Sequence, residues 1–348
     1  MPSARGRMRR AMSVTDLFKK DDFLSDAGLQ LNAAGRLHHL LTLQGLSKTL
    51  LTELLDRSEQ YLSPMGQPVV RSEALRGHTV ANLFFEPSTR TRASFDLAAR
   101  RMGADVLNLD VNTSSRKKGE SILDTLYTLQ SMQINIFVIR DASAGVPAYI
   151  ARHVDKHISI LNAGEADISH PTQGMLDLLT IRQHKADFGK LNVVIVGDIA
   201  HSRVARSVAA GLATMGVHEL RLVSPEALAP DPATFPPCRI MHNLDDGLAD
   251  ADVVMALRIQ RERIGNLDGI AGIDEYFANY GISSERMKLA APDAIVMHPG
   301  PMNRGIEIES SLADSRHSVI RQQVTNGVAV RMAVLATVAD SQESQCPD

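Results

Sequence analysis

The sequence is short of the features that mark secreted, membrane and nucleic-acid-binding proteins. It has only two cysteines in 348 residues. Cys238 and Cys346 lie far apart and fit no disulfide or metal-ligand pattern, which predicts a reducing compartment, the cytoplasm. The 37 Lys and Arg are balanced by 40 Asp and Glu, so no basic surplus attracts nucleic acid. No apolar run approaches the roughly 20 residues that span a bilayer. We therefore expect a globular protein with neither a nucleic-acid nor a membrane partner.

Residues 1–36 are predicted to be a weakly ordered N-terminal extension. Residues 5–10 are rich in arginine, but no apolar segment of the signal-peptide type follows them. We therefore do not expect a secretory signal.

The rest of the chain has the pattern of an α/β protein with two domains. A chain of 348 residues exceeds one ordinary hydrophobic core. Short apolar runs alternate with helical patterns in one series that ends near residue 184 and in a second that begins near residue 191. This alternation is typical of parallel sheets, so we expect two parallel-sheet domains with a site between them.

Individual elements follow from the periodicity of apolar residues. Strands are expected at 80–85, 105–111, 134–139, 158–161, 193–196, 219–223, 252–257 and 294–297. Helices are expected at 46–62, 93–102, 122–132, 175–184, 204–215, 274–289 and 328–338. The proline-rich segment 225–237 is expected to be irregular.

The most informative stretch is Ser88-Thr89-Arg90-Thr91-Arg92, which lies between the first strand and its helix. A helix N-terminus presents unpaired backbone N–H groups and the positive end of the helix dipole. Hydroxyls and guanidinium groups at the same place add donors that match phosphate oxygens. We therefore predict an oxyanion site. For Arg92 two interpretations stay open: contact with the ligand, or an internal ion pair with an acid such as Glu86.

Five further polar residues each follow an apolar run or lie in the loop behind it: Arg140, His170, Arg203, Arg258 and His298. In open parallel sheets, ligands bind beyond the carboxyl ends of the strands. The shared placement predicts a composite anion pocket between the domains. His298 is expected to shape a turn, and His201 to be a loop residue without a role in the site.

Seven motifs in order resemble the transcarbamylase family, and within it the aspartate-specific members. They are Ser88 to Arg92, Ser114 to Glu120, Arg140, His170-Pro171-Thr172-Gln173, Gly197-Asp198 with Arg203, Arg258-Ile259-Gln260, and His298-Pro299-Gly300-Pro301. The resemblance spans roughly residues 38–340. It implies a carbamoyl phosphate domain at 37–172 plus 316–348 and an aspartate domain at 173–315.

The resemblance also implies a role for each matching residue. Ser88, Thr89, Arg90 and Thr91 are expected to hold the phosphate of carbamoyl phosphate. Arg140 is expected to reach both the phosphate and the carbonyl oxygen. His170 is expected to donate to that oxygen as a neutral group, because nearby cations disfavour its charged form. Gln173 and the backbone of Pro299, Gly300 and Pro301 are expected at the carbamoyl amide. Arg203, Arg258 and Gln260 are expected to bind aspartate. Ser114 and Lys118 are expected to enter the site from a neighbouring subunit of a homotrimer. Lys118 is expected to contact aspartate too, and Arg90, Thr91, Lys118, Arg140 and His170 to act in catalysis.

The implied reaction is carbamoyl transfer to the α-amine of aspartate, a step of pyrimidine biosynthesis. No activated Ser or Cys is evident, and neither a metal nor an organic cofactor is expected. The site would have to position two anionic substrates and stabilise the charge that develops in the reaction, which explains why so many cationic side chains are expected there.

Two other functions are weighed against this one. An ornithine-specific member would be expected to carry a cysteine after His298, where this chain has Pro299, and Arg258 would repel the ornithine ammonium group. A non-catalytic scaffold subunit would be expected to have lost one of the site cations. The N-terminal extension leaves open the docking of a dihydroorotase-like or regulatory partner chain in an allosteric assembly.

Overall fold

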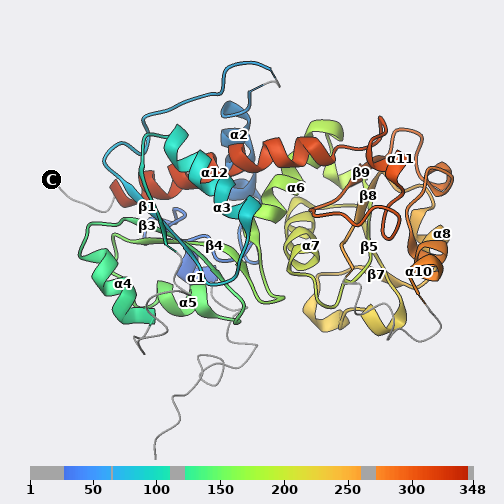
Figure 1. Ribbon diagram of the computed structural model, residues 1–348, viewed down its shortest axis with the longest axis horizontal. Helices are drawn as coiled ribbons and strands as arrows, with labels where there is room; N and C mark the ends of the chain where they lie inside the picture. Colours follow the sequence, from blue (N-terminus) through green and yellow to red (C-terminus); the bar gives the residue numbers. More distant parts are fainter. Residues whose placement is uncertain (1–26, 64–65, 110–121, 260–271, 344–348) are drawn as a thin grey trace, which may run out of the picture.

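The protein consists of two parallel β-sheets that lie side by side, each flanked by helices (Figure 1). The computed structural model describes residues 27–63, 66–109, 122–259 and 272–343. Both parallel sheets and the two-domain α/β class agree with the sequence pattern. None of the helices in the described ranges combines the length and apolarity needed to cross a membrane.

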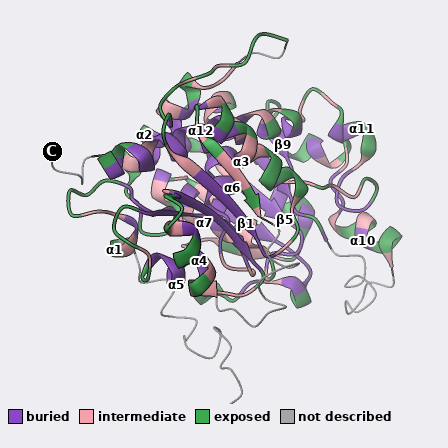
Figure 2. Cartoon of the chain, turned by 60° about the vertical axis from the view of Figure 1, so that its left-hand side comes forward, coloured by how far each residue is buried: buried purple, intermediate pink, exposed green. Residues whose placement is uncertain are grey.

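The first sheet has the strand order β2 (Asp105–Leu109), β1 (Thr79–Phe84), β3 (Ile136–Asp141) and β4 (Ser159–Glu165), all parallel. Successive side chains of a strand point to opposite faces of the sheet and join different hydrophobic clusters. Val80 lies on the face that packs against α3 (Thr89–Arg101), and Ala81 lies on the opposite face. Because both faces are covered, the central strands β1 and β3 are buried and mostly apolar. Figure 2 shows these strands as buried between partly exposed helices.

The second sheet has the order β7 (Arg239–Met241), β6 (Glu219–Val223), β5 (Asn192–Val196), β8 (Val253–Ala256) and β9 (Ile295–Met297), again all parallel. The remaining elements are α1 (Ala27–Gln30), α2 (Lys48–Gln60), α4 (Ile122–Gln130), α5 (Val146–Ala151), α6 (Pro171–His184), η4 (Phe188–Lys190), α7 (Arg203–Met215), η5 (Glu226–Leu228), η6 (Pro232–Thr234), α8 (Leu244–Leu248), α10 (Ile273–Tyr280), η7 (Arg286–Leu289), α11 (Ser310–Ala313) and α12 (Ile320–Glu343).

Two helices join the halves. The chain passes from the first sheet to the second through α6, and it returns from β9 through α12, which packs on α2, α3 and α6. One hydrophobic cluster accordingly holds Val138 of the first sheet, Ile195 of the second and Val334 of α12. This shared core fixes the carboxyl ends of the two sheets relative to each other.

Several predicted boundaries were wrong. Helix α3 begins at Thr89, four residues earlier than expected, because Ser88 takes the N-cap position. The expected helix 274–289 is broken after Tyr280, where the backbone at Gly281 turns extended. Helix α12 starts at Ile320 and not at 328, and α5, β7 and α8 were not foreseen. These three are six residues or fewer, too short for a periodic signal.

Gly174 of α6 and Gly211 of α7 allow these two helices to pack closely. A Cβ at Gly174 would lie 2.7 Å from Leu43 Cδ1 and 3.0 Å from the backbone oxygen of Ser207. We expect Gly174→Ala to lower the free energy of unfolding by about 1–3 kcal/mol, because the helix backbone cannot yield easily. Chemical denaturation measures this. Gly28→Ala is the control: no atom lies within 4 Å of its Cβ, so a similar loss there would contradict the packing argument.

Candidate active site

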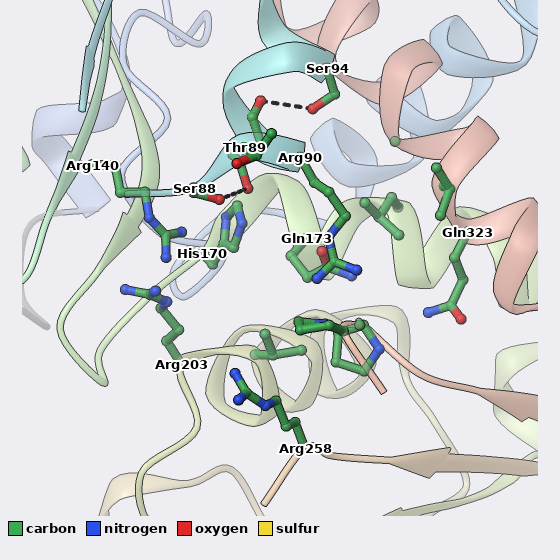
Figure 3. Close-up of a pocket in the computed structure, with 18 of the residues that line it drawn as sticks. Ser88, Thr89, Arg90, Ser94, Arg140, His170, Gln173, Arg203, Arg258 and Gln323 are labelled. Carbon is green, nitrogen blue, oxygen red and sulfur yellow. Dashed lines mark hydrogen bonds between the residues drawn. The ribbon is translucent and has the colours of Figure 1, made fainter. Parts of the chain in front are cut away.

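A cavity of about 680 Å³ opens between the carboxyl ends of the two sheets (Figure 3). Its walls come from the β1–α3 loop, the end of β3, the N-termini of α6 and α7, the segments after β8 and β9, and the start of α12. Each half of the molecule thus supplies side chains to the same space.

The N-terminus of α3 forms one wall. Ser88 occupies the N-cap with an extended backbone, but its side chain makes no capping hydrogen bond. Its hydroxyl instead donates to Thr91 Oγ1 at 3.0 Å, and the Ser94 hydroxyl donates to the Thr91 carbonyl oxygen at 2.8 Å. Backbone N–H groups of the first helical turn are therefore left for a ligand, which is the arrangement that binds anions.

Two guanidinium groups enter the cavity from opposite domains, Arg90 from the first and Arg258 from the second. Neither makes a hydrogen bond or ion pair with another residue in the described part of the chain. Burial lowers the pKa of Arg90, and the charge of Arg258 lowers it further. Two uncompensated cations in one cavity favour a ligand with more than one negative charge.

Glu86 links two other arginines across the domain boundary. Its carboxylate accepts from Arg140 Nη2 at 2.7 Å, and from Arg203 Nη1 at 3.0 Å and Nη2 at 2.9 Å. Burial raises the pKa of Glu86, but hydrogen bonds and charges from Arg203 and Arg140 outweigh it, so the net shift is downward. Glu86 therefore does not pair with Arg92, which is exposed and does not line the cavity. The predicted ion pair of Arg92 with Glu86 was therefore wrong, and its exposed position outside the cavity argues against contact with a ligand.

His170 is the N-cap residue of α6, and its ring is buried against the cavity. Its backbone N–H donates to Ser207 Oγ at 2.8 Å, and its Nδ1 has no hydrogen-bond partner among the described residues. Burial holds the pKa of His170 well below its usual range, and the charges of Arg331, Arg140 and Arg203 lower it further. The imidazole is therefore neutral at neutral pH and can donate one hydrogen bond.

A buried network behind Gln173 was not foreseen. Gln173 Nε2 donates to both carboxyl oxygens of Asp177, at 3.1 and 3.3 Å, and Gln323 Nε2 donates to Asp177 Oδ1 at 2.7 Å. Burial raises the pKa of Asp177 to about 7, and it lowers that of Arg331 to about 10. Gln323 and Arg331 reach the cavity from α12, so no strand-end pattern in the sequence points to them.

The segment after β9 is held by a buried histidine. Gly300 N–H donates to His298 Nδ1 at 2.7 Å, and His298 Nε2 lies 3.2 Å from Glu307 Oε1. His298 thus shapes this turn, as expected. Gly300 has φ +66°, and a Cβ there would lie 2.4 Å from Arg90 Nη1. A glycine is needed both for the backbone conformation and for the approach of Arg90.

Comparisons with known proteins identify the family. The carbamoyl-P binding domain of the aspartate/ornithine carbamoyltransferases matches residues 38–183, and their Asp/Orn binding domain matches residues 189–338. The chain belongs to this family. It is a carbamoyltransferase, as its sequence motifs indicated.

Solved structures of the family resemble this carbamoyltransferase over most of its length. Aspartate transcarbamoylase from Trypanosoma cruzi, in complex with carbamoyl aspartate and phosphate, is 28% identical, with 88% of this chain and 98% of that chain covered and a TM-score of 0.77. Ornithine carbamoyltransferase from Pyrococcus furiosus is 26% identical, with 87% and 97% covered and a TM-score of 0.76. The ornithine enzyme from Thermus thermophilus, 24% identical, covers 86% and 98% with a TM-score of 0.75, which shows the shared fold.

Most residues singled out in the sequence of this carbamoyltransferase line the one cavity. They are Ser88, Thr89, Arg90, Thr91, Arg140, His170, Gln173, Arg203, Arg258, Pro299, Gly300 and Pro301. Ser114, Lys118 and Gln260 lie outside the described residues. His201 does not line the cavity; its Nδ1 lies 2.7 Å from Asp198 Oδ1. In the described ranges, no three His, Cys, Asp or Glu side chains gather into a metal site.

The neutral state of His170 predicts how stability depends on pH. Because its pKa is lower in the folded than in the unfolded chain, the unfolded chain binds the proton more readily below pH of about 6.5. The full contribution of His170 to the free energy of unfolding is therefore present above that pH. As the pH falls below it, the free energy of unfolding decreases by up to about 1.4 kcal/mol per pH unit. Urea unfolding at pH 7.5 and 5.5 measures the loss. His170→Asn should flatten the dependence, whereas His157→Asn, at an exposed position, should not. Equal slopes in all three proteins would refute the assignment.

Proposed function

We propose that this carbamoyltransferase transfers the carbamoyl group of carbamoyl phosphate to the α-amine of L-aspartate. The products are N-carbamoyl-L-aspartate and phosphate, a step of pyrimidine biosynthesis. The observation that carries the proposal is Arg258, a cation of the second domain that lines the cavity and has no ion-pair partner among the described residues. Arg258 attracts the side-chain carboxylate of aspartate and repels the side-chain ammonium of ornithine. Pro299, where a cysteine is expected in an ornithine-specific member, supports the same choice.

The first substrate is proposed to bind at the N-terminus of α3. Backbone N–H groups, the hydroxyls of Ser88, Thr89 and Thr91, and the Arg90 guanidinium suit a phosphate dianion. Arg140 and His170 would then reach the carbonyl oxygen. The carbamoyl amide would donate to Gln173 and to backbone carbonyls of residues 299–301. Asp177 supports this placement, because the Gln173 NH₂ group donates to it and that bond fixes the orientation of the amide.

The second substrate is proposed to bind between Arg203 and Arg258, with Gln260 beside them. In the structure both terminal nitrogens of Arg203 donate to Glu86, so the α-carboxylate of aspartate must share or displace that interaction. We propose that Ser114 and Lys118 complete the site from a neighbouring subunit of a trimer, and that the enzyme acts in the cytoplasm.

The chemistry needs no covalent intermediate on the protein. The amine attacks the carbonyl carbon, the carbonyl oxygen becomes an oxyanion, and the C–O bond to phosphate then breaks. The proton that the attacking nitrogen loses passes to the departing phosphate. In this proposal His170, as a neutral donor, and Arg140 stabilise that oxyanion; both residues line the cavity. Holding both substrates in one cavity lowers the entropic barrier of a bimolecular reaction.

The test is carbamoyl transfer by the purified chain, with aspartate or ornithine offered in parallel beside carbamoyl phosphate. We expect carbamoyl aspartate and no citrulline. Citrulline alone would overturn the roles of Arg203, Arg258 and Gln260 and leave the phosphate site intact. If neither product forms while carbamoyl phosphate still binds, the chain is a scaffold or needs a partner, and removal of residues 1–26 followed by mass measurement of native complexes tests for a docked partner.

A further inference from the structure

A second cavity, here called the α7 cavity, lies between the domains away from the substrate residues. Its volume is about 310 Å³, at the lower end of the range of roughly 300–1,000 Å³ for small-molecule sites. Leu41, Glu165 and Ile168 of the first domain line it, together with Arg206, Ala210 and Phe235 of the second. Nothing in the proposed carbamoyl transfer uses these residues.

Glu165 provides an unsatisfied polar group on one wall. It is 6% exposed, and its Oε2 makes no hydrogen bond with any described residue. Burial raises the pKa of Glu165 to about 8. The charge of Asp141 also raises this pKa, whereas the hydrogen bond from the Gly145 N–H lowers it. The raised pKa favours the protonated carboxylic acid at neutral pH. A buried polar atom without a partner is costly, and such atoms are rare in folded proteins.

Arg206 forms a flat wall elsewhere in the cavity. Its guanidinium lies over the Phe235 ring, 5.1 Å from the centroid, and donates to Thr234 Oγ1 at 2.8 Å and to the Ala200 carbonyl oxygen at 3.0 Å. Asp167 lies 3.6 Å away and balances its charge. Unlike Arg90 and Arg258, this arginine is not an uncompensated cation, so it does not call for an anionic ligand.

We propose that the α7 cavity binds a small, uncharged, mostly apolar molecule with a flat ring and one amide or carbonyl group. The ring would lie among Leu41, Ile168 and Ala210, near the Arg206–Phe235 pair, and the polar group would hydrogen-bond to Glu165. An anion would lie near the negative charge of Asp141, which already acts on Glu165. A cation would lie near the guanidinium of Arg206 in the cavity wall and near the charge of Arg203, which also acts on Glu165.

Helix α7 connects this ligand with the substrate cavity. Arg203, at the first position of α7, lines the substrate cavity, whereas Arg206 and Ser207 in the same turn line the α7 cavity. Ser207 Oγ accepts the backbone N–H of His170. A molecule in the α7 cavity would therefore contact the helix that positions both Arg203 and His170, and it would bridge the two domains.

Three probes of nearly equal shape test the proposal: benzamide is neutral, benzamidine is cationic and benzoate is anionic. Binding to the full chain is measured by ligand-observed NMR titration in phosphate buffer, which occupies the substrate cavity. We expect benzamide to bind with a dissociation constant on the order of 1 mM, as suits a small fragment, and the charged probes to bind at least tenfold more weakly. No benzamide binding, or equal binding of a charged probe, overturns the proposal.

Two variants locate the bound probe. Ala210→Phe should fill the cavity and weaken benzamide binding at least tenfold, whereas Ala278→Phe adds the same ring at an exposed position and should leave binding unchanged. If Ala210→Phe fails to fold, Ala210→Leu, which adds a smaller side chain to the cavity, replaces it. The same loss of benzamide affinity is expected. Equal affinity in the filled and control proteins would place the probe elsewhere and sink the proposal.

Discussion

Arg90→Ala is expected to lower kcat/KM for carbamoyl transfer by about 10²–10³-fold, the effect of removing one preorganised donor to developing charge. Arg90 lies at the start of α3 beside unbonded backbone donors, and its guanidinium is held against Gly300. It has no internal counter-ion among the described residues, so its charge is directed to the ligand. Steady-state kinetics with both substrates varied would measure the loss.

The chain offers a matched control for this change. Arg92 lies two residues further along α3, but it is exposed and outside the cavity. We expect Arg92→Ala to retain activity within about twofold. Arg90→Lys should recover only part of the rate, because an ammonium group cannot donate as a fork. A loss in Arg92→Ala as large as in Arg90→Ala would show that the helix needs its positive charge as a whole.

Arg258→Gln is expected to reduce kcat/KM for aspartate by about 100-fold, because charge-assisted hydrogen bonds to a carboxylate contribute about 1.5–3 kcal/mol each. The affinity for carbamoyl phosphate should change little, since the proposed phosphate donors all lie in the first domain. This contrast separates the two substrate sites. Arg90→Ala, in comparison, should lower the affinity for carbamoyl phosphate.

The measurement combines initial rates over a range of aspartate with equilibrium titration of carbamoyl phosphate. Arg258 lies close enough to Arg90 for its charge to lower the Arg90 pKa, so a role at the phosphate is the competing possibility. If Arg258→Gln weakens the binding of carbamoyl phosphate as much as the binding of aspartate, Arg258 binds the phosphate. The argument for aspartate over ornithine would then lose its main support.

The strand-end rule found the substrate cavity because parallel sheets bring distant residues to one edge. Arg140, His170, Arg203 and Arg258 were each predicted from a local pattern, and all four line the cavity. The partner of Arg140 and Arg203 was not predicted. Glu86 lies six residues from Arg92, but the orientation of α3 directs Arg92 to solvent and leaves Glu86 facing the opposite domain.

The network of Asp177, Gln323 and Arg331 could not be read from the sequence for a different reason. These residues lie on the buried faces of α6 and α12, where a polar residue among apolar ones has no periodic signature of its own. Their contacts depend on how the two helices cross, which is a property of the packed core. Helix ends were also missed where polar residues begin the helix ahead of its apolar positions, as Thr89 and Arg90 do in α3.

The return of α12 to the first domain has a consequence for the order of folding during synthesis. Helices α2 and α3 are synthesised early, but the helix that covers both of them, α12, consists of residues 320–343. At roughly 5–20 residues per second, the ribosome needs on the order of ten seconds to make the intervening second domain. During that time the apolar surface of α2 and α3 that packs on α12 has no covering helix, so the first domain cannot close its core until residues 320–343 are made.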